Sequence, residues 1–380
     1  IQVTDIGLCT TPLLYFSIHT LERAGGVMVT GSHNPPEFNG MKLCVDSSTL
    51  HGDQIQEVRR VIEGGEMASG VGALTNHDIL PEYLDELSKT FDFKRPLKVV
   101  VDCGNGTGGL VAPKLFQRLG CDVVELYCDV DGTFPNHHPD PTVEANLVDL
   151  RQTVVDEEAD LGLAYDGDAD RIGAVDERGE IIWGDKLLIL FSREILSRKP
   201  GATIISEVKA STTLYDDIRA HGGNPVMWKT GHSLIKAKMK ETGAELAGEL
   251  SGHMFFSDGY YGFDDAVFAS CRLIDIIASG DTPVTGLLAD VPDTVSTPEI
   301  RVDCPDEEKF PLIERLKERL RQDHEIIDVD GVRVVFPDGW ALARASNTQP
   351  VLVLRFEALT EERLQEMREL VEGAIEAVKQ

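Results

Sequence analysis

The chain has 380 residues with an ordinary globular composition, 42% hydrophobic and 27% charged, which predicts about two to four domains rather than a disordered or fibrous protein. Its 36 basic and 65 acidic residues leave a formal net charge of −29, which argues against nucleic acid or an anionic membrane as a partner. No apolar run is long enough to span a bilayer, and the seven cysteines form no C-x-x-C pair, which indicates reduced thiols in a cytoplasmic protein.

Runs of β-branched residues recur along the chain, each followed by a glycine-rich or polar stretch. They predict a buried strand and then a loop in residues 26–32, 97–109, 159–171 and 201–212. Such a repeat is typical of α/β layers, which build their sites from loops at strand ends.

Helices are expected between these strands. One ends at Gly120, and another is expected to run from a cap at Ser233 to a stop at Gly243. Residues 288–304 contain prolines and no helical stripe, which suggests a linker into a last domain. That domain is expected to end in an amphipathic helix with one apolar face formed by Leu364, Met367, Val371, Ala374, Ile375 and Val378.

The first loop that could carry chemistry is TGSHNPPEFNGMK, residues 30–42. Its two prolines exclude a helix and Asn39-Gly40 favours a turn, so Ser32 should lie on a rigid loop. A lone turn serine commonly bonds its own backbone, and this is not a G-x-S-x-G elbow. Donors at His33, Asn34 and Lys42 nevertheless suggest an anion held on the hydroxyl.

The second loop, in AYDGDADR, alternates three acids, Asp166, Asp168 and Asp170. Carboxylates about 4 Å apart repel by roughly 4 kcal/mol per pair at an effective dielectric of 20, so their convergence requires a cation. All-oxygen ligation suits Mg²⁺ or Ca²⁺. An EF-hand is the rival interpretation, and it fails at its sixth position, where Arg171 replaces glycine. The alternative without a metal site is three acidic residues on a solvated surface loop.

Two further loops offer weaker signals. GELSGHMFF, residues 248–256, carries groups suited to sugar hydroxyls or phosphate, and RASNTQP, residues 344–350, has the composition of a phosphate cradle. Taken alone, the first is a weak signal, and for the second a satisfied surface turn is at least as good an interpretation. The candidate residues are Glu249, Ser251 and His253 in the first, and Arg344, Ser346, Asn347 and Thr348 in the second.

A fifth stretch, GNGTGG at residues 104–109, fits the dinucleotide fingerprint G-x-G-x-x-G after a strand. The alternative is a tight turn that needs glycine for packing. We favour the turn, because the other loops call for phosphate and magnesium and nothing calls for a nicotinamide.

In this order the loops resemble the α-D-phosphohexomutase family, and within it the phosphomannomutase/phosphoglucomutase branch; KTGHS, residues 229–233, matches a further family segment. The resemblance implies an α/β protein with three tandem related α/β domains and a C-terminal α+β domain around a central cleft. The expected limits are 1–78, 79–182, 183–293 and 294–380. In this family the glycine-rich turn binds no dinucleotide.

The resemblance also implies the chemistry. Phosphorylated Ser32 would transfer its group to a hexose phosphate through a hexose 1,6-bisphosphate, and Mg²⁺ would be held by Asp166, Asp168, Asp170 and an oxygen on Ser32. Arg171 would aid charge neutralisation, and Lys42 and His232 are the candidate general base and acid. The partner would be a small hexose phosphate, bound by His33, Asn34, Lys209, Glu249, Ser251, His253, Arg344, Ser346, Asn347 and Thr348.

One departure from the family lies at the front. Members normally begin with a tyrosine- and arginine-containing segment well ahead of the phosphoserine loop, whereas Ser32 comes early in a chain that opens on Ile1. We therefore expect an N-terminally truncated member whose turnover depends on the missing part. The alternatives are a phosphoglucosamine mutase, a metal-dependent sugar-phosphate phosphatase and a non-catalytic sugar-phosphate binder.

Overall fold

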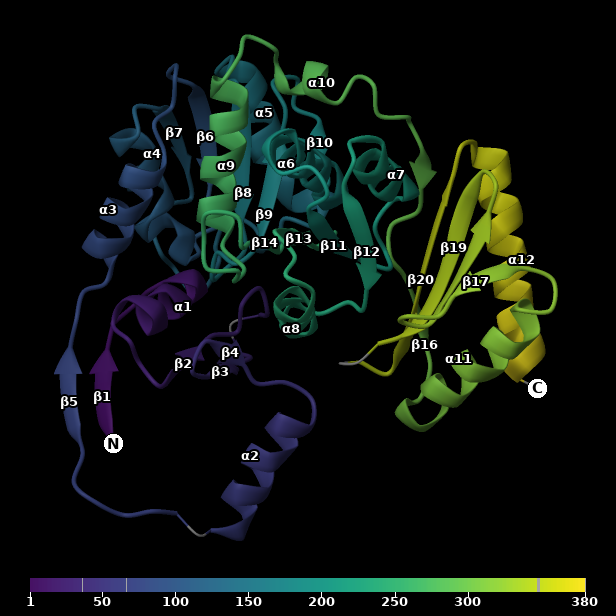
Figure 1. Ribbon diagram of the computed structural model, residues 1–380, viewed down its shortest axis with the longest axis horizontal. Coiled ribbons are helices and arrows are strands. Elements are labelled where there is room, and N and C mark those ends of the chain that lie inside the picture. The colour runs from purple at the N-terminus through teal and green to yellow at the C-terminus, as the bar shows by residue number, and fades with distance from the viewer. Residues whose placement is uncertain (36, 66, 347–348, 380) are drawn as a thin grey trace.

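The computed structural model describes residues 1–35, 37–65, 67–346 and 349–379, and Figure 1 shows three α/β groups followed by a fourth group at the C-terminal end. No helix among these residues is long and apolar enough to cross a membrane.

The first group has two small sheets, the parallel pair β1-β5 and the antiparallel sheet β2-β3-β4. Helix α1 is its buried element: Thr10 caps it by accepting from Leu13 N, and Pro12 occupies the first turn. The elements are β1 Gln2–Asp5, α1 Thr11–Thr20, β2 Gly25–Val29, β3 Met41–Val45, β4 Ser48–Thr49, α2 Asp53–Gly64 and β5 Ala73–Asn76.

The strand and loop expected in residues 26–32 are present, but the expectation that the strand is buried is wrong. Strand β2 ends at Val29 and packs only one face, where Gly26 lies close to Leu14 and Ile18 of α1. Val27 and Val29 point away from α1 and are more than half exposed. The β-branched pattern identified the strand, but which faces are covered depends on its neighbours.

The second group contains a five-stranded sheet in the order β10-β9-β8-β6-β7, with β6 parallel to β7 and β8 and antiparallel pairing from β8 onward. Its strands β6 and β8 are buried along nearly their whole length, as expected for a covered α/β sheet. The elements are α3 Leu80–Thr90, β6 Lys98–Asp102, η1 Thr107–Leu110, α4 Ala112–Arg118, β7 Asp122–Leu126, η2 Glu144–Leu147, α5 Val148–Asp156, β8 Leu161–Tyr165, β9 Ile172–Val175 and β10 Ile181–Ile182.

The third group repeats this topology in the sheet β12-β11-β13-β14, where β11 is parallel to β12 and β13 and β14 turns back antiparallel. The elements are α6 Gly184–Arg198, β11 Thr203–Glu207, α7 Thr212–Ala220, β12 Asn224–Trp228, α8 His232–Thr242, β13 Leu246–Gly248, β14 Met254–Phe256, α9 Ala266–Ala278 and α10 Val284–Leu287. The expected stop at Gly243 is confirmed, but the cap at Ser233 is wrong. The cap is Gly231 and helix α8 begins at His232, two residues earlier than expected, and the N–H of Gly231 donates to Glu249.

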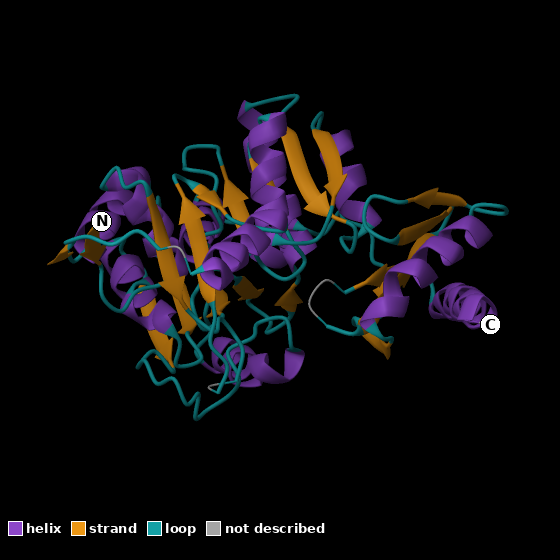
Figure 2. Cartoon of the chain, turned by 90° about the horizontal axis from the view of Figure 1, so that it is seen from below, coloured by secondary structure: helices purple, strands orange, loops and turns teal. Residues whose placement is uncertain are grey.

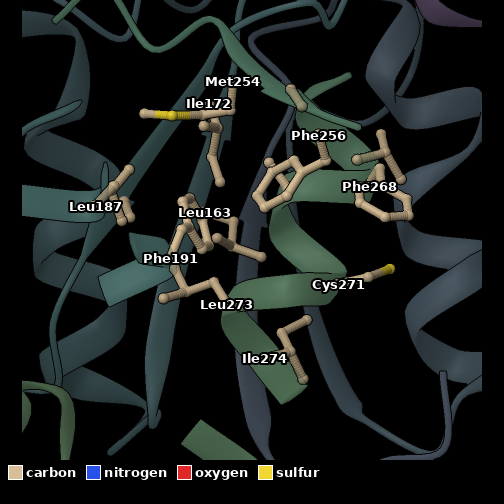
Figure 3. Close-up of a cluster of buried hydrophobic side chains, with 14 of the residues drawn as sticks. Leu163, Ile172, Leu187, Phe191, Met254, Phe256, Phe268, Cys271, Leu273 and Ile274 are labelled. Carbon is tan, nitrogen blue, oxygen red and sulfur yellow. The ribbon is translucent and has the colours of Figure 1, made fainter. Parts of the chain in front are cut away.

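Helices α6 and α9 join the second and third sheets, because each contacts strands of both. Figure 3 shows the packing: Leu163 and Ile172 of the second sheet and Met254 and Phe256 of the third surround side chains of α6 and α9, including Phe191. One continuous hydrophobic core therefore runs through the first three groups and fixes their loops relative to one another.

The fourth group is an antiparallel sheet in the order β15-β20-β19-β18-β17, with β16 also paired to β20. Residues 288–304, expected as a linker, contribute two of its strands. Helices α11 and α12 cover one face (Figure 2), and the apolar face of α12 is confirmed. On the other face Trp340 and Leu342 contact Val208 of the third group. The elements are β15 Val295–Ser296, β16 Ile300–Asp303, α11 Asp306–Leu320, β17 Glu325–Ile327, β18 Val332–Phe336, β19 Gly339–Ala345, β20 Val351–Ala358 and α12 Glu361–Lys379.

Candidate active site

The four loops expected to carry chemistry share one topological position. Each joins a strand to the antiparallel strand that follows it: β2 to β3, β8 to β9, β13 to β14 and β19 to β20. In the second and third groups the strand before the loop is also parallel to its inner neighbour. The Asp166–Arg171 and Glu249–His253 loops therefore leave equivalent ends of two similar sheets.

Ser32 is held in an uncommon backbone conformation. Its φ is 52°, in the left-handed region that non-glycine residues seldom adopt. The hydroxyl of Thr30 accepts from Ser32 N at 2.8 Å, and Ser32 Oγ donates to Asp166 Oδ2 at 2.8 Å. Pro36 lies outside the described residues. The loop thus aims the serine at the acidic cluster.

Two glycines, Gly167 and Gly106, let the serine loop, the acidic loop and the glycine-rich turn pack closely against one another. A Cβ on Gly167 would lie 2.2 Å from the carbonyl oxygen of Ser32, and a Cβ on Gly106 would lie 2.8 Å from the carbonyl oxygen of Gly167. Thr107 N donates to the same Gly167 oxygen at 2.9 Å. The glycine-rich turn at 104–109 therefore supports the acidic loop by close backbone packing.

Three buried carboxylates converge in this loop. Asp166, Asp168 and Asp170 are at most 2% exposed, and each offers an oxygen within 4.8 Å of the others. The loop is a hairpin turn between strands β8 and β9, which differs from the helix-loop-helix of an EF-hand. Burial and the two neighbouring carboxylates raise the pKa of Asp166 well above its usual range.

The chemistry of this donor set fits Mg²⁺. Among the described residues no hydrogen bond reaches the buried Oδ1 of Asp168, and the buried Oδ1 of Asp170 has only the ion-pair contact with His253 Nε2 at 3.3 Å. Buried carboxylate oxygens without a donor are costly, and a hard divalent cation would use them as ligands. The residues present can therefore hold the ion that the sequence predicts.

Side-chain cations surround the cluster. Lys42 Nζ lies 2.9 Å from Asp168 Oδ2 and also contacts Asp170. Burial lowers the pKa of Lys42, but Asp170 and Asp168 outweigh it and raise that pKa, so the ammonium form is favoured. Arg171 Nε lies 3.9 Å from Asp166 Oδ2.

His253 links the acidic loop to the loop expected to bind sugar. Its Nε2 is 3.3 Å from Asp170 Oδ1, and its Nδ1 is 2.8 Å from Glu249 Oε2 and 3.0 Å from Ser251 Oγ. Burial lowers the pKa of His253, but Asp170 and Glu249 raise it to about 9. Burial likewise raises the pKa of Glu249, and the bond to His253 lowers it to about 2. The pair is therefore charged near neutral pH.

His232, at the first position of α8, stacks on His253 with ring centroids 5.5 Å apart. Its Nδ1 lies 2.9 Å from Asp264 Oδ2. Burial lowers the pKa of His232, although Asp264 opposes the shift, so the neutral ring is favoured near neutral pH.

Lys209 approaches from the end of β11. Its Nζ pairs with Glu299 at 2.6 Å, and its backbone N–H donates to Glu207. Burial lowers the pKa of Lys209, but Glu207 and Glu299 raise it overall. Glu207 also accepts from Thr230 Oγ1 at 3.2 Å, which ties Lys209 to the KTGHS segment.

The fourth loop meets the third group through Asp330, which accepts from Arg344 Nε at 3.0 Å and from Thr230 N at 3.1 Å. Ser346 is buried, and its hydroxyl accepts from Gln349 N. The two other residues expected in this cradle, Asn347 and Thr348, lie outside the described residues. Arg344 is thus connected to Lys209 through Asp330, Thr230 and Glu207.

The remaining two predicted binders differ from each other. His33 Nδ1 lies 3.1 Å from Asp140 Oδ2, which anchors its ring beside the acidic loop. Among the described residues Asn34 forms a hydrogen bond only through its backbone N–H, which donates to Gly31 O. The structure therefore places His33 in the network and leaves Asn34 at the rim of the loop.

Several residues of this network escaped the sequence analysis. Two threonines donate to Asp168 Oδ2, Thr11 at 2.7 Å and Thr30 at 3.0 Å. Thr30 and Thr230 stand inside quoted motifs, so their positions were available as a signal. Asp140, Glu207 and Asp264 stand in stretches without any motif, and only the folded chain brings them to the site.

Comparison with known families covers most of the chain. Models described as phosphoglucomutase/phosphomannomutase alpha/beta/alpha domains I, II and III match residues 1–68, 81–179 and 183–295. The model described as the C-terminal domain of the same family matches residues 299–374.

Individual proteins agree with these matches. A phosphomannomutase/phosphoglucomutase of Pseudomonas aeruginosa is 50% identical over 378 residues, which are 99% of this chain and 82% of that protein. A phosphoglucomutase of Neisseria meningitidis is 45% identical over 382 residues, covering 99% of this chain and 83% of its own length. A crystal structure of a phosphoglucomutase/phosphomannomutase family protein from Burkholderia thailandensis superposes with a TM-score of 0.93 at 42% identity, covering 100% of this chain and 83% of that one.

Proposed function

The chain belongs to the phosphoglucomutase/phosphomannomutase family, whose enzymes are isomerases, and we propose that it moves a phosphoryl group between O1 and O6 of mannose or glucose phosphate by way of Ser32. The observation that supports this role best is Ser32 Oγ itself, held on a strained turn 2.8 Å from Asp166 of the buried acidic cluster. A group that is given and taken back needs a fixed carrier.

In the proposed cycle phosphorylated Ser32 faces the free hydroxyl of a bound hexose phosphate. The bond between phosphorus and Ser32 Oγ breaks as the sugar oxygen bonds to phosphorus, which leaves a hexose 1,6-bisphosphate. The sugar then reorients, and its other phosphate returns to Ser32. Magnesium on Asp166, Asp168 and Asp170 would neutralise charge on the transferring group.

Proton transfer is assigned to two groups whose surroundings favour opposite protonation states, with the base and acid roles of Lys42 and His232 exchanged relative to the sequence expectation. Lys42 is held protonated by Asp168 and Asp170 and can supply a proton to Ser32 Oγ. His232 is held neutral by burial and can accept the proton of the attacking hydroxyl. Near neutral pH Lys42 is therefore in the form that can donate a proton and His232 in the form that can accept one, as an acid and a base require.

Substrate binding is assigned to the connected residues around this centre. Glu249 and Ser251 would accept and donate to sugar hydroxyls, while His253, Lys209 and Arg344 supply the positive charge that a dianionic phosphate needs. His33, Asn34, Ser346, Asn347 and Thr348 complete the set that we propose from the sequence, with Arg171 neutralising charge beside Asp166.

A coupled assay on the full-length protein tests the reaction and its substrate. We expect isomer formation from mannose 1-phosphate and glucose 1-phosphate, stimulated by Mg²⁺ and by hexose 1,6-bisphosphate, and intact mass spectrometry should find one phosphoryl group on Ser32. Faster turnover of glucosamine 1-phosphate would favour the amino sugar instead. Release of inorganic phosphate without isomer would contradict the mutase assignment and indicate a phosphatase, and an unphosphorylated Ser32 with no turnover would indicate a binder.

Gly167→Ala tests the contact between the acidic loop and the serine loop. The added Cβ would meet the Ser32 carbonyl oxygen at 2.2 Å, so one loop must move and Ser32 loses its alignment. We expect kcat to fall about 100-fold, because small misplacements of reacting groups have effects of this size. Steady-state kinetics and the melting temperature separate this loss from unfolding.

The matched control is Gly132→Ala, in a loop of the same group where an added Cβ meets nothing within 4 Å. It should leave kcat unchanged. Equal activity of Gly167→Ala and the control would show that the two loops can separate freely.

We also propose that the protein works in a reducing compartment, the cytoplasm. All seven cysteines are free, and six of them are buried, which is the state expected where thiols stay reduced.

A further inference from the structure

The contacts of Asp264 go beyond what the proposed mechanism uses. This residue lies between β14 and α9 and is fully buried. One carboxylate oxygen, Oδ2, lies 2.9 Å from His232 Nδ1, and the other, Oδ1, accepts from Lys236 Nζ at 2.8 Å. Each oxygen of Asp264 therefore has a defined partner.

Both partners come from the same face of α8. His232 is the first residue of the helix and Lys236 follows four residues later, so the two side chains point the same way. A buried carboxylate needs charge compensation, and Lys236 supplies it without occupying the oxygen that faces the histidine. The lysine thus keeps Asp264 ionised and available as an acceptor.

A residue from the first group holds Lys236 in place. Its Nζ lies 4.1 Å from the centroid of the Tyr15 ring on α1, a distance typical of a cation–π contact. Tyr15 is itself 4% exposed. The chain Tyr15, Lys236, Asp264, His232 therefore joins α1 to α8 beside the acidic cluster.

The other edge of His232 is left available. Its ring stacks on His253 at an interplanar angle of 20°, and about a quarter of its side chain is exposed. Within the described part of the chain Nε2 makes no hydrogen bond, whereas Nδ1 is fixed on Asp264. An ionised carboxylate accepts only, so the proton of a neutral ring must reside on Nδ1.

We propose that Asp264, supported by Lys236, is a positioning residue that fixes the tautomer and orientation of His232, so that its bare Nε2 faces the substrate. This inference rests on the proposed function, in which His232 accepts the proton of the attacking hydroxyl. It assigns to Asp264 the role that a buried carboxylate plays behind a histidine base in hydrolases.

Asp264→Asn tests the proposal directly. Its amide can donate to Nδ1, which favours the opposite tautomer and places a proton on Nε2. We expect kcat to fall about 10- to 100-fold, within the range of general-base effects, while KM changes less than about threefold. Nitrogen NMR of labelled histidine, at a pH where His232 is neutral, should show the proton moving from Nδ1 to Nε2.

Two further variants test the positioning role of Asp264 if Asp264→Asn is poorly folded. Lys236→Met leaves the bond between Asp264 and His232 possible but removes its support, so kcat should lie between wild type and Asp264→Asn. The double variant His232→Asn with Asp264→Asn should be no slower than His232→Asn alone, because a residue that acts through another is non-additive with it.

The matched control is Asp265→Asn, which changes the next buried carboxylate in the chain. Asp265 accepts from Tyr83, Tyr260 and Phe268 N and makes no contact with His232. It should move the melting temperature more than kcat, and leave the tautomer of His232 unchanged.

The outcomes separate the two claims. An unchanged tautomer in Asp264→Asn, or full additivity in the double variant, would overturn the positioning role even if His232→Asn is slow. Wild-type kcat in His232→Asn would instead overturn the base role of His232 in the proposed function, and the inference with it.

Discussion

Ser32→Ala is expected to abolish turnover, by at least about 10⁴-fold, since removal of a covalent nucleophile stops both halves of the reaction. The variant lacks the oxygen that donates to Asp166, but its backbone is still held by Thr30. Its fold should therefore persist. The measurement is the coupled assay with glucose 1-phosphate, together with the intact mass, which should lack the phosphoryl group.

Ser48→Ala is the matched control for this change. Ser48 lies on β4 of the same small sheet and is exposed, so its loss should alter neither turnover nor the bound phosphoryl group. Substantial turnover by Ser32→Ala would mean that another residue carries the phosphoryl group. A phosphoryl group still found on the Ser32→Ala protein would show that a residue other than Ser32 is phosphorylated.

Asp168→Asn is expected to lower kcat by about 10³-fold and to weaken Mg²⁺ binding. The amide replaces one of three converging carboxylates with a neutral group, so the site loses a full negative charge that a divalent cation would otherwise balance. It also weakens the ion pair with Lys42, which we assign as the proton donor. The measurements are kcat against Mg²⁺ concentration and calorimetric titration of Mg²⁺ itself.

Asp176→Asn is the control that tests whether loss of any buried carboxylate near this sheet lowers kcat and weakens Mg²⁺ binding as Asp168→Asn does. Asp176 is 7% exposed and accepts from Arg178 N and Glu180 N at the turn after β9, outside the acidic loop. Its replacement should cost stability but leave the Mg²⁺ dependence unchanged. Wild-type turnover and Mg²⁺ affinity in Asp168→Asn would overturn the metal assignment.

The parts of the fold that the sequence predicted well are those set by local pattern. Strands β6, β8 and β11 lie where β-branched runs indicated buried strands, and α12 buries the expected apolar face. The wrong predictions concern features that depend on tertiary contacts. The serine at 233 looked like a cap, but the N-cap position is Gly231, whose own N–H donates to the Glu249 carboxylate.

The candidate site divides in the same way. Motifs supplied Ser32, the three aspartates and His253, because each stands in a loop whose residue types are informative on their own. Their roles in the reaction remain predictions. Asp264 carried no signal, since FDDA reads as an ordinary acidic turn before a helix, and its proximity to His232 spans 32 residues of chain.

The sequence by itself determined the α/β class, the family and the loops for which we propose phosphate chemistry, because these follow from periodicity and from short motifs. The tertiary structure decided which groups lie next to each charged side chain, and therefore its protonation state. Lys42 is a protonated counter-ion because Asp168 and Asp170 reach it across more than a hundred residues, and Gly167 is required because the Ser32 carbonyl lies against it. Electrostatic shifts and close contacts depend on distances in space, which the order of residues along a chain does not contain.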